Sequence, residues 1–184
     1  MRAFRFNKLY LLCLLPFAAG ANVVDVGAYK DATVIYNTDD CDGTPCAFIN
    51  HGSDTTLTAS VQSASVQRIL LAFALPSGIN LATAKCQLQM QRPVQAPSGK
   101  YTLVVSEALG DWDEEEVNGS DKIDTGNQVG SVSAVKNERP GVVDVTGACR
   151  NSKDGQVGLW VDSSGPEVSF PSRDTGAAAQ LRIF

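Results

Sequence analysis

The sequence has little of what enzymes use for nucleophilic catalysis. Its 184 residues include one histidine, His51, and no Gly-x-Ser-x-Gly motif. A catalytic triad needs a base that is hydrogen-bonded to a nucleophile and an acid that orients the base. His51 lies in the loop-like sequence Asn-His-Gly-Ser-Asp, where a lone histidine is more often a structural residue. These absences favour a protein without a catalytic apparatus.

Hydrophobic runs long enough to span a membrane are also missing. The most apolar run, residues 9–19, is well short of the about 20 residues that a spanning helix needs. Basic residues precede it and the small residues 18–21 follow it, which is the pattern of a secretory signal peptide. We therefore interpret residues 1–21 as a signal peptide and residues 22–184 as a secreted, extracellular domain with no membrane partner. An N-glycosylation triplet, Asn-Gly-Ser beginning at Asn118, fits this compartment.

Positive charge is scarce. The whole sequence has 15 lysine and arginine residues against 20 aspartate and glutamate residues. Three of the basic residues lie in residues 1–21, so the secreted part carries 12 basic and 20 acidic residues, a formal charge of −8. Nucleic acids and anionic membranes attract proteins through a positive field. The composition therefore argues against either partner.

Cysteine is sparse, and even in number once the signal peptide is set aside. Cys13 lies in that peptide, and the others are Cys41, Cys46, Cys86 and Cys149. In an oxidising compartment an even number indicates two disulfides, for which three pairings exist. The turn-forming Asp-Gly-Thr-Pro sequence at the first pair favours Cys41–Cys46, which would leave Cys86–Cys149. A zinc site is the alternative, but a second close cysteine pair is missing.

What the sequence does have is hydrophobic alternation with a period of two. In residues 68–75 large apolar side chains recur at every second position, and in residues 86–91 three apolar residues alternate with three glutamines. Such alternation is typical of strands buried on one face. Turns rich in glycine and proline separate the segments. The pattern predicts an all-β fold, a single jelly-roll-like antiparallel β-sandwich, with a long polar surface loop at residues 111–141 and helical turns only at 80–85 and 111–117.

A sugar-binding face can be proposed from the outward positions of these strands. Trp160 alternates with inward-facing apolar residues, so it points to the opposite face. The glutamines Gln87, Gln89 and Gln91 also face outward. Together they could form a polar groove with an aromatic ring for stacking on a sugar. Alternatively, Trp160 is covered by the 111–141 loop.

Acidic residues suggest two further sites. The run Asp-Trp-Asp-Glu-Glu-Glu at residues 111–116 could supply the paired carboxylates of a glycosidase, but adjacent acids are more typical of a solvated loop with Trp112 packed beneath it. Calcium prefers carboxylate and carbonyl oxygens from flexible loops. The candidate ligands of a structural calcium ion are Asp39, Asp40, Asp42 and Asp54. We expect no other cofactor.

Several segments together resemble one family of secreted modules. In chain order they are DATV (31–34), NHGSDTTLT (50–58), RILLAFALP (68–76), ATAKCQL (82–88), DWDE (111–114), VDVT (143–146) and VSFPSRD (168–174). Their order is similar to that of the DNRLRE-type domain, also called carbohydrate-binding module family 96, and the resemblance covers essentially the whole secreted part. It implies a jelly-roll β-sandwich found on extracellular proteins, often attached to polysaccharide-degrading enzymes.

For the residues that match this family we expect one structural cluster, in which Arg173 bridges carboxylates near the two chain ends, because an arginine fork pairs well with carboxylates. The residues that match the family's recurrent positions are Asp31, Asn50, Gly52, Ser53, Ser172, Arg173 and Asp174. Two departures argue against a polyanionic ligand such as alginate. The family's Phe-Asp-Leu strand is Phe-Ala-Leu at residues 73–75, and the secreted part is acidic.

We therefore predict a monomeric, non-catalytic module that binds an extracellular polysaccharide or other glycan, preferably a neutral one. One alternative is a structural or host-interaction protein that uses the sandwich as a scaffold for the 111–141 loop. The other is a polysaccharide lyase or hydrolase that uses Asp113 and Glu115 of the acidic run.

Overall fold

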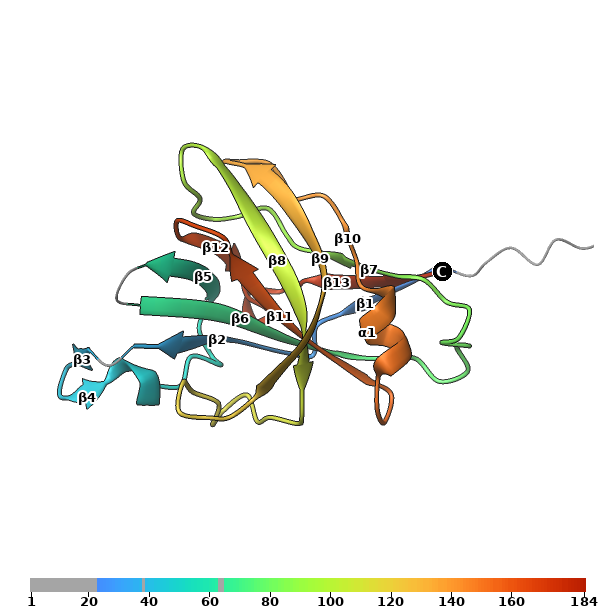
Figure 1. Ribbon diagram of the computed structural model, residues 1–184, viewed down its shortest axis with the longest axis horizontal. Coiled ribbons are helices and arrows are strands. Elements are labelled where there is room, and N and C mark those ends of the chain that lie inside the picture. Colours follow the sequence, from blue (N-terminus) through green and yellow to red (C-terminus); the bar gives the residue numbers. More distant parts are fainter. Residues whose placement is uncertain (1–22, 38, 63–64) are drawn as a thin grey trace, which may run out of the picture.

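A computed structural model describes residues 23–37, 39–62 and 65–184 (Figure 1). The predicted signal peptide, residues 1–21, lies outside the described residues. The strands and helices are β1 Val24–Gly27, β2 Lys30–Tyr36, β3 Asp40–Cys41, β4 Thr44–Pro45, η1 Cys46–Phe48, β5 Thr56–Gln62, β6 Ser65–Ala74, β7 Cys86–Gln89, β8 Lys100–Leu109, β9 Asp124–Val135, β10 Val143–Asp144, α1 Thr146–Asn151, β11 Gln156–Ser163, β12 Val168–Pro171, η2 Arg173–Thr175 and β13 Gln180–Ile183. No helix in these ranges is long and apolar enough to cross a membrane.

The strands form two main antiparallel sheets. The larger has the order β12-β5-β6-β11-β8-β9, with β2 also paired to β6, and the smaller has the order β1-β13-β7-β10. The short strands β3 and β4 form a separate hairpin that projects from one end of the molecule (Figure 1). This arrangement confirms the all-β, antiparallel β-sandwich, whereas the jelly-roll connectivity stays a prediction.

The alternating residues pack between the two sheets in what we name the inner core. Ile69, Leu71 and Phe73 of β6 are fully buried there. Leu88 of β7 and Leu181 of β13 reach the same cluster from the smaller sheet. Burying a side chain of this size stabilises the fold by about 1.5–3 kcal/mol relative to leaving it exposed. The inward faces predicted from the period of two are therefore correct.

Strand β6 is buried on its other face as well. Leu70 and Ala72 point away from the inner core and pack with Trp160 of β11 in a second cluster, the outer core. Residues 111–123 cross this face and contribute Trp112 to the cluster. The buried members of the outer core are Ala32, Val34, Leu70, Ala72, Ala108, Trp112, Val117 and Trp160. The predicted packing of Trp112 beneath its own loop is confirmed.

The predicted surface loop at residues 111–141 is only partly a loop. Residues 111–123 cover the outer core, but Asp124–Val135 is strand β9, which pairs with β8. An edge strand with one solvated face needs little apolar alternation, so its sequence did not stand out. The predicted helical turns form within residues 80–85 and 111–117, each closed by a backbone hydrogen bond between residues four apart, but the prediction missed the α-helix α1 at Thr146–Asn151.

Two disulfides fasten segments to the sandwich. Cys41 is joined to Cys46 across the β3–β4 hairpin, with the Cα atoms 5.1 Å apart. Cys86 of β7 is joined to Cys149 of α1, with the Cα atoms 6.5 Å apart. This is the pairing that the turn between the first two cysteines favoured. The second disulfide is buried and holds α1 against the smaller sheet.

Candidate functional site

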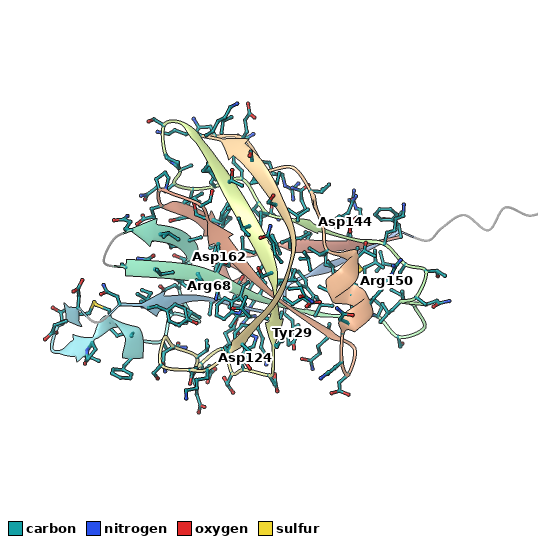
Figure 2. All side chains as sticks on the ribbon, in the orientation of Figure 1. Tyr29, Arg68, Asp124, Asp144, Arg150 and Asp162 are labelled. Carbon is teal, nitrogen blue, oxygen red and sulfur yellow. A yellow bond between two sulfur atoms is a disulfide. The ribbon has the colours of Figure 1, made fainter. Side chains whose placement is uncertain are left out.

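The structure does not place Trp160 on an exposed face. Its side chain points away from the inner core, as predicted, but it is fully buried in the outer core beneath residues 111–123. The guanidinium of Arg68 lies 4.2 Å from the ring centroid and is itself paired with the carboxylate of Asp162 (Figure 2). The prediction of Trp160 as a platform for sugar stacking is therefore wrong, because the chain itself covers that surface.

The three glutamines lie on the smaller sheet and mainly support its surroundings. Gln89 donates from Nε2 to the carbonyl of Pro140 at 2.6 Å, and Gln91 donates to the carbonyl of Ala178 at 2.7 Å. Gln87 lies on β7, between β13 and β10. All three side chains are half-buried. The predicted groove does not form, because the glutamines and the tryptophan belong to different sheets.

Residues matched to the family resemblance do meet in space. Asp31 is wholly buried, and its carboxylate accepts hydrogen bonds from Ser172 Oγ at 2.9 Å and from the backbone N–H of Arg173 at 2.8 Å. The Arg173 guanidinium forms a bidentate ion pair with Glu114. Its Nε donates to Oε1 at 2.8 Å and its Nη2 donates to Oε2. Arg173 therefore connects two carboxylates, one through its backbone and one through its side chain.

Asn50 and Gly52 hold the backbone around Glu114. Asn50 Nδ2 donates to the carbonyls of Glu114 and Val117, each at 2.8 Å. A Cβ atom at Gly52 would lie 1.8 Å from the carbonyl oxygen of Glu114, so the close approach requires glycine. These contacts join residues that are more than 60 positions apart in the chain.

We name this set the clasp, because it ties residues 111–123 to the sandwich. Its members are Asp31, Asn50, Gly52, Glu114, Ser172 and Arg173. Two residues predicted to belong to it, Ser53 and Asp174, are exposed at its margin, and Asp174 lies 3.8 Å from Arg173. The assignment of Glu114 to a solvated acidic loop was wrong. A half-buried arginine requires an acid nearby. The expected burial of Arg173 was therefore the feature of the sequence that could have pointed to Glu114.

Asp31 is expected to titrate above the ordinary range of an aspartate. Burial raises its pKa, and the hydrogen bonds from Arg173 and Ser172 only partly oppose this effect. Between the unfolded and the folded pKa, the folded protein binds more protons than the unfolded protein, so this group's contribution to stability falls as pH rises through that window. Replacing Ser172→Ala removes a donor to the carboxylate and should raise the pKa of Asp31 further.

Carboxyl-carbon NMR titration of the wild type and the Ser172→Ala variant measures this shift. Asp25 serves as an internal control, because its hydrogen-bonded pairing with Arg182 lowers the pKa of Asp25. The sign for Asp25 is opposite, so its contribution to stability is lost as pH falls through its folded pKa. An Asp31 pKa below the ordinary aspartate value would contradict the prediction.

The aspartates proposed for calcium do not gather into one site. Asp54 Oδ2 pairs with His51 Nδ1 at 2.9 Å, whereas Asp40 accepts a hydrogen bond from the backbone of Gly43 in the hairpin turn. Across the described residues, no three His, Cys, Asp or Glu side chains come together as a metal would need. Asp39, Asp40, Asp42 and Asp54 are separately exposed. Binding of a structural calcium ion by these residues stays a prediction.

The glycosylation triplet lies in a tight turn of the segment over the outer core. Asn118 Oδ1 accepts hydrogen bonds from the backbone and the hydroxyl of Ser120, at 2.9 and 2.6 Å. Its Nδ2, the atom that a glycan would modify, donates to the carbonyl of Glu116 at 3.0 Å. Modification of Asn118 stays a prediction.

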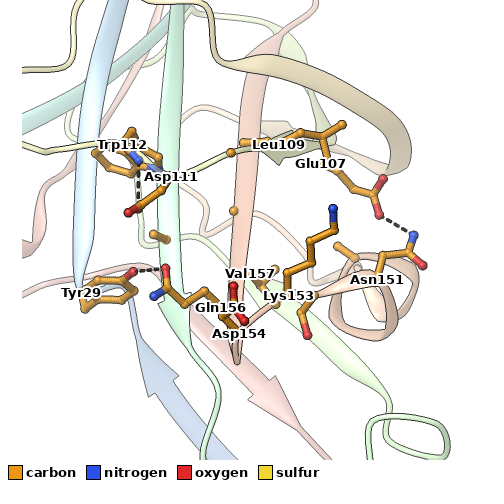
Figure 3. Close-up of a pocket in the computed structure, with 16 residues that line it drawn as sticks. Tyr29, Glu107, Leu109, Asp111, Trp112, Asn151, Lys153, Asp154, Gln156 and Val157 are labelled. Atoms are coloured by element: carbon orange, nitrogen blue, oxygen red, sulfur yellow. Dashed lines mark hydrogen bonds between the residues drawn. The ribbon is translucent and has the colours of Figure 1, made fainter.

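A pocket of about 330 Å³ opens beside the start of residues 111–123 (Figure 3). Its wall comes from the end of β8, the end of α1, the turn before β11 and the segment before β2. The polar side chains that line it are Tyr29, Glu107, Asp111, Asn151, Ser152, Lys153, Asp154 and Gln156. This volume lies at the lower end of the range for small-molecule sites.

Hydrogen bonds orient the polar groups of this pocket. The Tyr29 hydroxyl donates to Gln156 Oε1 at 2.7 Å, and Asn151 Nδ2 donates to Glu107 Oε1 at 2.8 Å (Figure 3). Glu107 is 6% exposed. None of these four residues stands out in the sequence, because three of them occupy ordinary strand or helix positions and the pocket forms only when distant segments come together.

A cation lies beside the two aromatic rings that line the pocket. Lys30 Nζ lies 5.6 Å from the ring centroid of Tyr29 and 5.4 Å from that of Trp112. The same ammonium pairs with Asp111 Oδ1 at 3.3 Å. The hydrogen bond from the Trp112 backbone and then the pairing with Lys30 lower the pKa of Asp111. Asp111 is therefore an anion already matched to a cation.

Comparison with known proteins supports an extracellular compartment for this protein. The chain matches no protein-family model. It is 28% identical over 162 residues to an uncharacterized secreted protein of Arthroderma benhamiae, a match that covers 85% of this chain and 83% of that protein. The relative's secretion and the two disulfides are consistent with an extracellular protein.

Proposed function

We propose that this protein is a secreted, non-catalytic module that binds a carbohydrate in the pocket beside residues 111–123. The observation that carries the proposal is the lining of that pocket, which combines the rings of Tyr29 and Trp112 with amide, hydroxyl and carboxylate groups. Sugars present hydroxyls that both donate and accept hydrogen bonds, together with apolar faces that pack on aromatic rings. A concave site with a few convergent polar groups suits such a ligand.

The polar pairs in the pocket keep hydrogen-bonding capacity for a ligand. Tyr29 uses its proton on Gln156 Oε1, which leaves the phenol oxygen as an acceptor and the Gln156 amide as a donor. Asn151 uses its amide on Glu107, which leaves its own carbonyl as an acceptor. Because the partners fix these orientations before binding, less side-chain entropy is lost when a sugar binds.

The clasp weighs against a scaffold that displays a free loop. Glu114 ties residues 111–123 to the sandwich through Arg173 and the backbone of Asp31, and residues 124–135 belong to β9. The enzymatic alternative also lacks support at this pocket, because its proposed acids Asp113 and Glu115 are not among the residues that line it. Carbohydrate binding agrees with the family resemblance in the sequence.

Isothermal titration against soluble oligosaccharides of cellulose, chitin, chitosan, xylan and β-1,3-glucan tests the proposal. We expect Gln156→Ala to weaken binding about tenfold, because a hydrogen bond to the ligand is lost. Gln95→Ala is the matched control, since Gln95 is exposed and bonds to Glu167 instead of lining the pocket. If the folded protein bound none of these sugars, sugar binding would be rejected, and release of shorter sugars would reject a non-catalytic role.

A further inference from the structure

We infer that the pocket selects a sugar unit that carries a free amine, such as glucosamine within a partly or fully deacetylated polysaccharide. This inference rests on the proposed carbohydrate binding and names the chemistry that the pocket favours. Three observations support it. The buried carboxylate of Glu107 is hydrogen-bonded only to neutral donors, the hydroxyl of Ser152 has no hydrogen-bond partner, and acidic side chains lie around the pocket.

Glu107 is a buried acid without a cationic partner. Its Oε1 accepts from the Asn151 amide at 2.8 Å and its Oε2 accepts from the backbone N–H of Asn127 at 3.2 Å. Both donors are neutral. In the part of the chain that the structure describes, no lysine, arginine or histidine nitrogen lies within 4.0 Å of this carboxylate. A carboxylate removed from water gains most from a paired cation.

Strand β9 holds Glu107 in place. A Cβ atom at Gly126 would lie 2.9 Å from both the Cβ atom and Oε2 of Glu107, so the bare glycine backbone packs directly against this side chain. Together with the Asn127 and Asn151 hydrogen bonds, this contact fixes where the carboxylate lies. A ligand can therefore meet an acceptor that needs little rearrangement.

Ser152 also lines this pocket, and rotation of its side chain would present a second acceptor to a ligand. Its Oγ atom is buried and, among the described residues, has no hydrogen-bond partner. A buried hydroxyl without a partner costs free energy, so a ligand group that bonds to it is favoured. An ammonium group has three donors and no acceptor, whereas Glu107 and Ser152 both offer oxygen lone pairs. An N-acetyl group offers one donor and no positive charge.

The charges around the pocket point to the same ligand. Asp154 also lines the pocket, while the charge of Asp111 is already matched by Lys30. Lys153 is the basic residue among those that line the pocket, and its side chain is exposed. Figure 3 shows this side chain extending in the direction of Glu107. The positive charge of this ammonium repels a cationic ligand, so Lys153 lowers the affinity of the pocket for an amine.

Calorimetric titration of two matched probes tests the inference: the tetramer of glucosamine and the tetramer of N-acetylglucosamine. We expect the wild type to bind the glucosamine tetramer at least about tenfold more tightly, with a preference that weakens as salt is added. Glu107→Gln keeps the shape of the side chain but removes its charge, and it should abolish the preference. Lys153→Gln should strengthen binding of the amine probe about threefold. Thermal unfolding confirms that each variant is folded.

The outcomes separate this inference from the proposed function. Equal affinity for the two tetramers, or an unchanged preference in Glu107→Gln, would overturn amine selection and leave sugar binding at the pocket intact. If Glu107→Gln did not fold, the Lys153→Gln variant decides, because weaker binding of the amine probe would also overturn the inference. Sugar binding that Gln156→Ala leaves unchanged would instead overturn the location of the site.

Discussion

Removing the disulfide between Cys86 and Cys149 is expected to lower the free energy of unfolding by about 4 kcal/mol. The two cysteines are 63 positions apart, so the bond restricts a long loop of the unfolded chain. Both side chains are buried between β7 and α1, where alanine leaves no unpaired polar group. The double variant Cys86→Ala with Cys149→Ala should therefore unfold at a much lower urea concentration, as followed by far-ultraviolet circular dichroism.

The second disulfide provides the matched control. Cys41 and Cys46 are five positions apart, one in the exposed hairpin and the other buried just after it, so the same chain-entropy relation gives at most about 2 kcal/mol for Cys41→Ala with Cys46→Ala. Among the residues that the structure describes, the two strands of this hairpin pair only with each other, and loss of the hairpin should leave both cores intact. Equal losses of stability in the two double variants would contradict the argument.

Replacing Gly52→Ala is expected to destabilise the protein by about 3 kcal/mol or to detach residues 111–123. The new Cβ atom would lie 1.8 Å from the carbonyl oxygen of Glu114 and 2.9 Å from its Cγ atom, so backbone must move. The movement separates Glu114 from Arg173, and the half-buried arginine then lacks its acid. Urea unfolding and limited proteolysis measure the two outcomes, the second as new cleavage within residues 111–123.

Gly99→Ala is the control for this substitution. A Cβ atom at Gly99 would meet no atom within 4 Å, and its backbone lies outside the left-handed region. The stability of this variant should stay within about 0.5 kcal/mol of the wild type, with any change a gain from a less flexible unfolded chain. Equal changes in the free energy of unfolding for Gly52→Ala and Gly99→Ala would show that the close contact between Gly52 and Glu114 does not affect stability.

The hydrophobic alternation with a period of two was sufficient to predict the β-sandwich, because the alternation within each strand shows which of its faces is buried. Ile69, Leu71 and Phe73 repeat at alternate positions wherever their neighbours lie. Trp160 shows the limit of this reasoning. Alternation predicted which face of the sheet it occupies, but whether another segment covers that face depends on contacts with residues 111–123, far away in the chain.

The candidate site was harder to predict because its residues carry no local pattern. Tyr29, Glu107, Asn151 and Gln156 come from four segments, and their roles follow only from mutual hydrogen bonds. Residues of the clasp could be found in part, since the resemblance grouped them, but Glu114 looked like one more exposed acid in a run. Its burial depends on a partner that is 59 positions away.

The outer core gives the protein a built-in optical reporter. The chain has two tryptophans, Trp112 and Trp160, and both lie in the outer core. Intrinsic tryptophan fluorescence therefore reports whether residues 111–123 are packed against the outer core. The far-ultraviolet circular dichroism of the strands reports whether the whole sandwich is folded. If the segment lifts before the sheets separate, the emission maximum will shift at a lower denaturant concentration than the loss of strand signal. That difference would give the free energy of the local opening directly, without any added label.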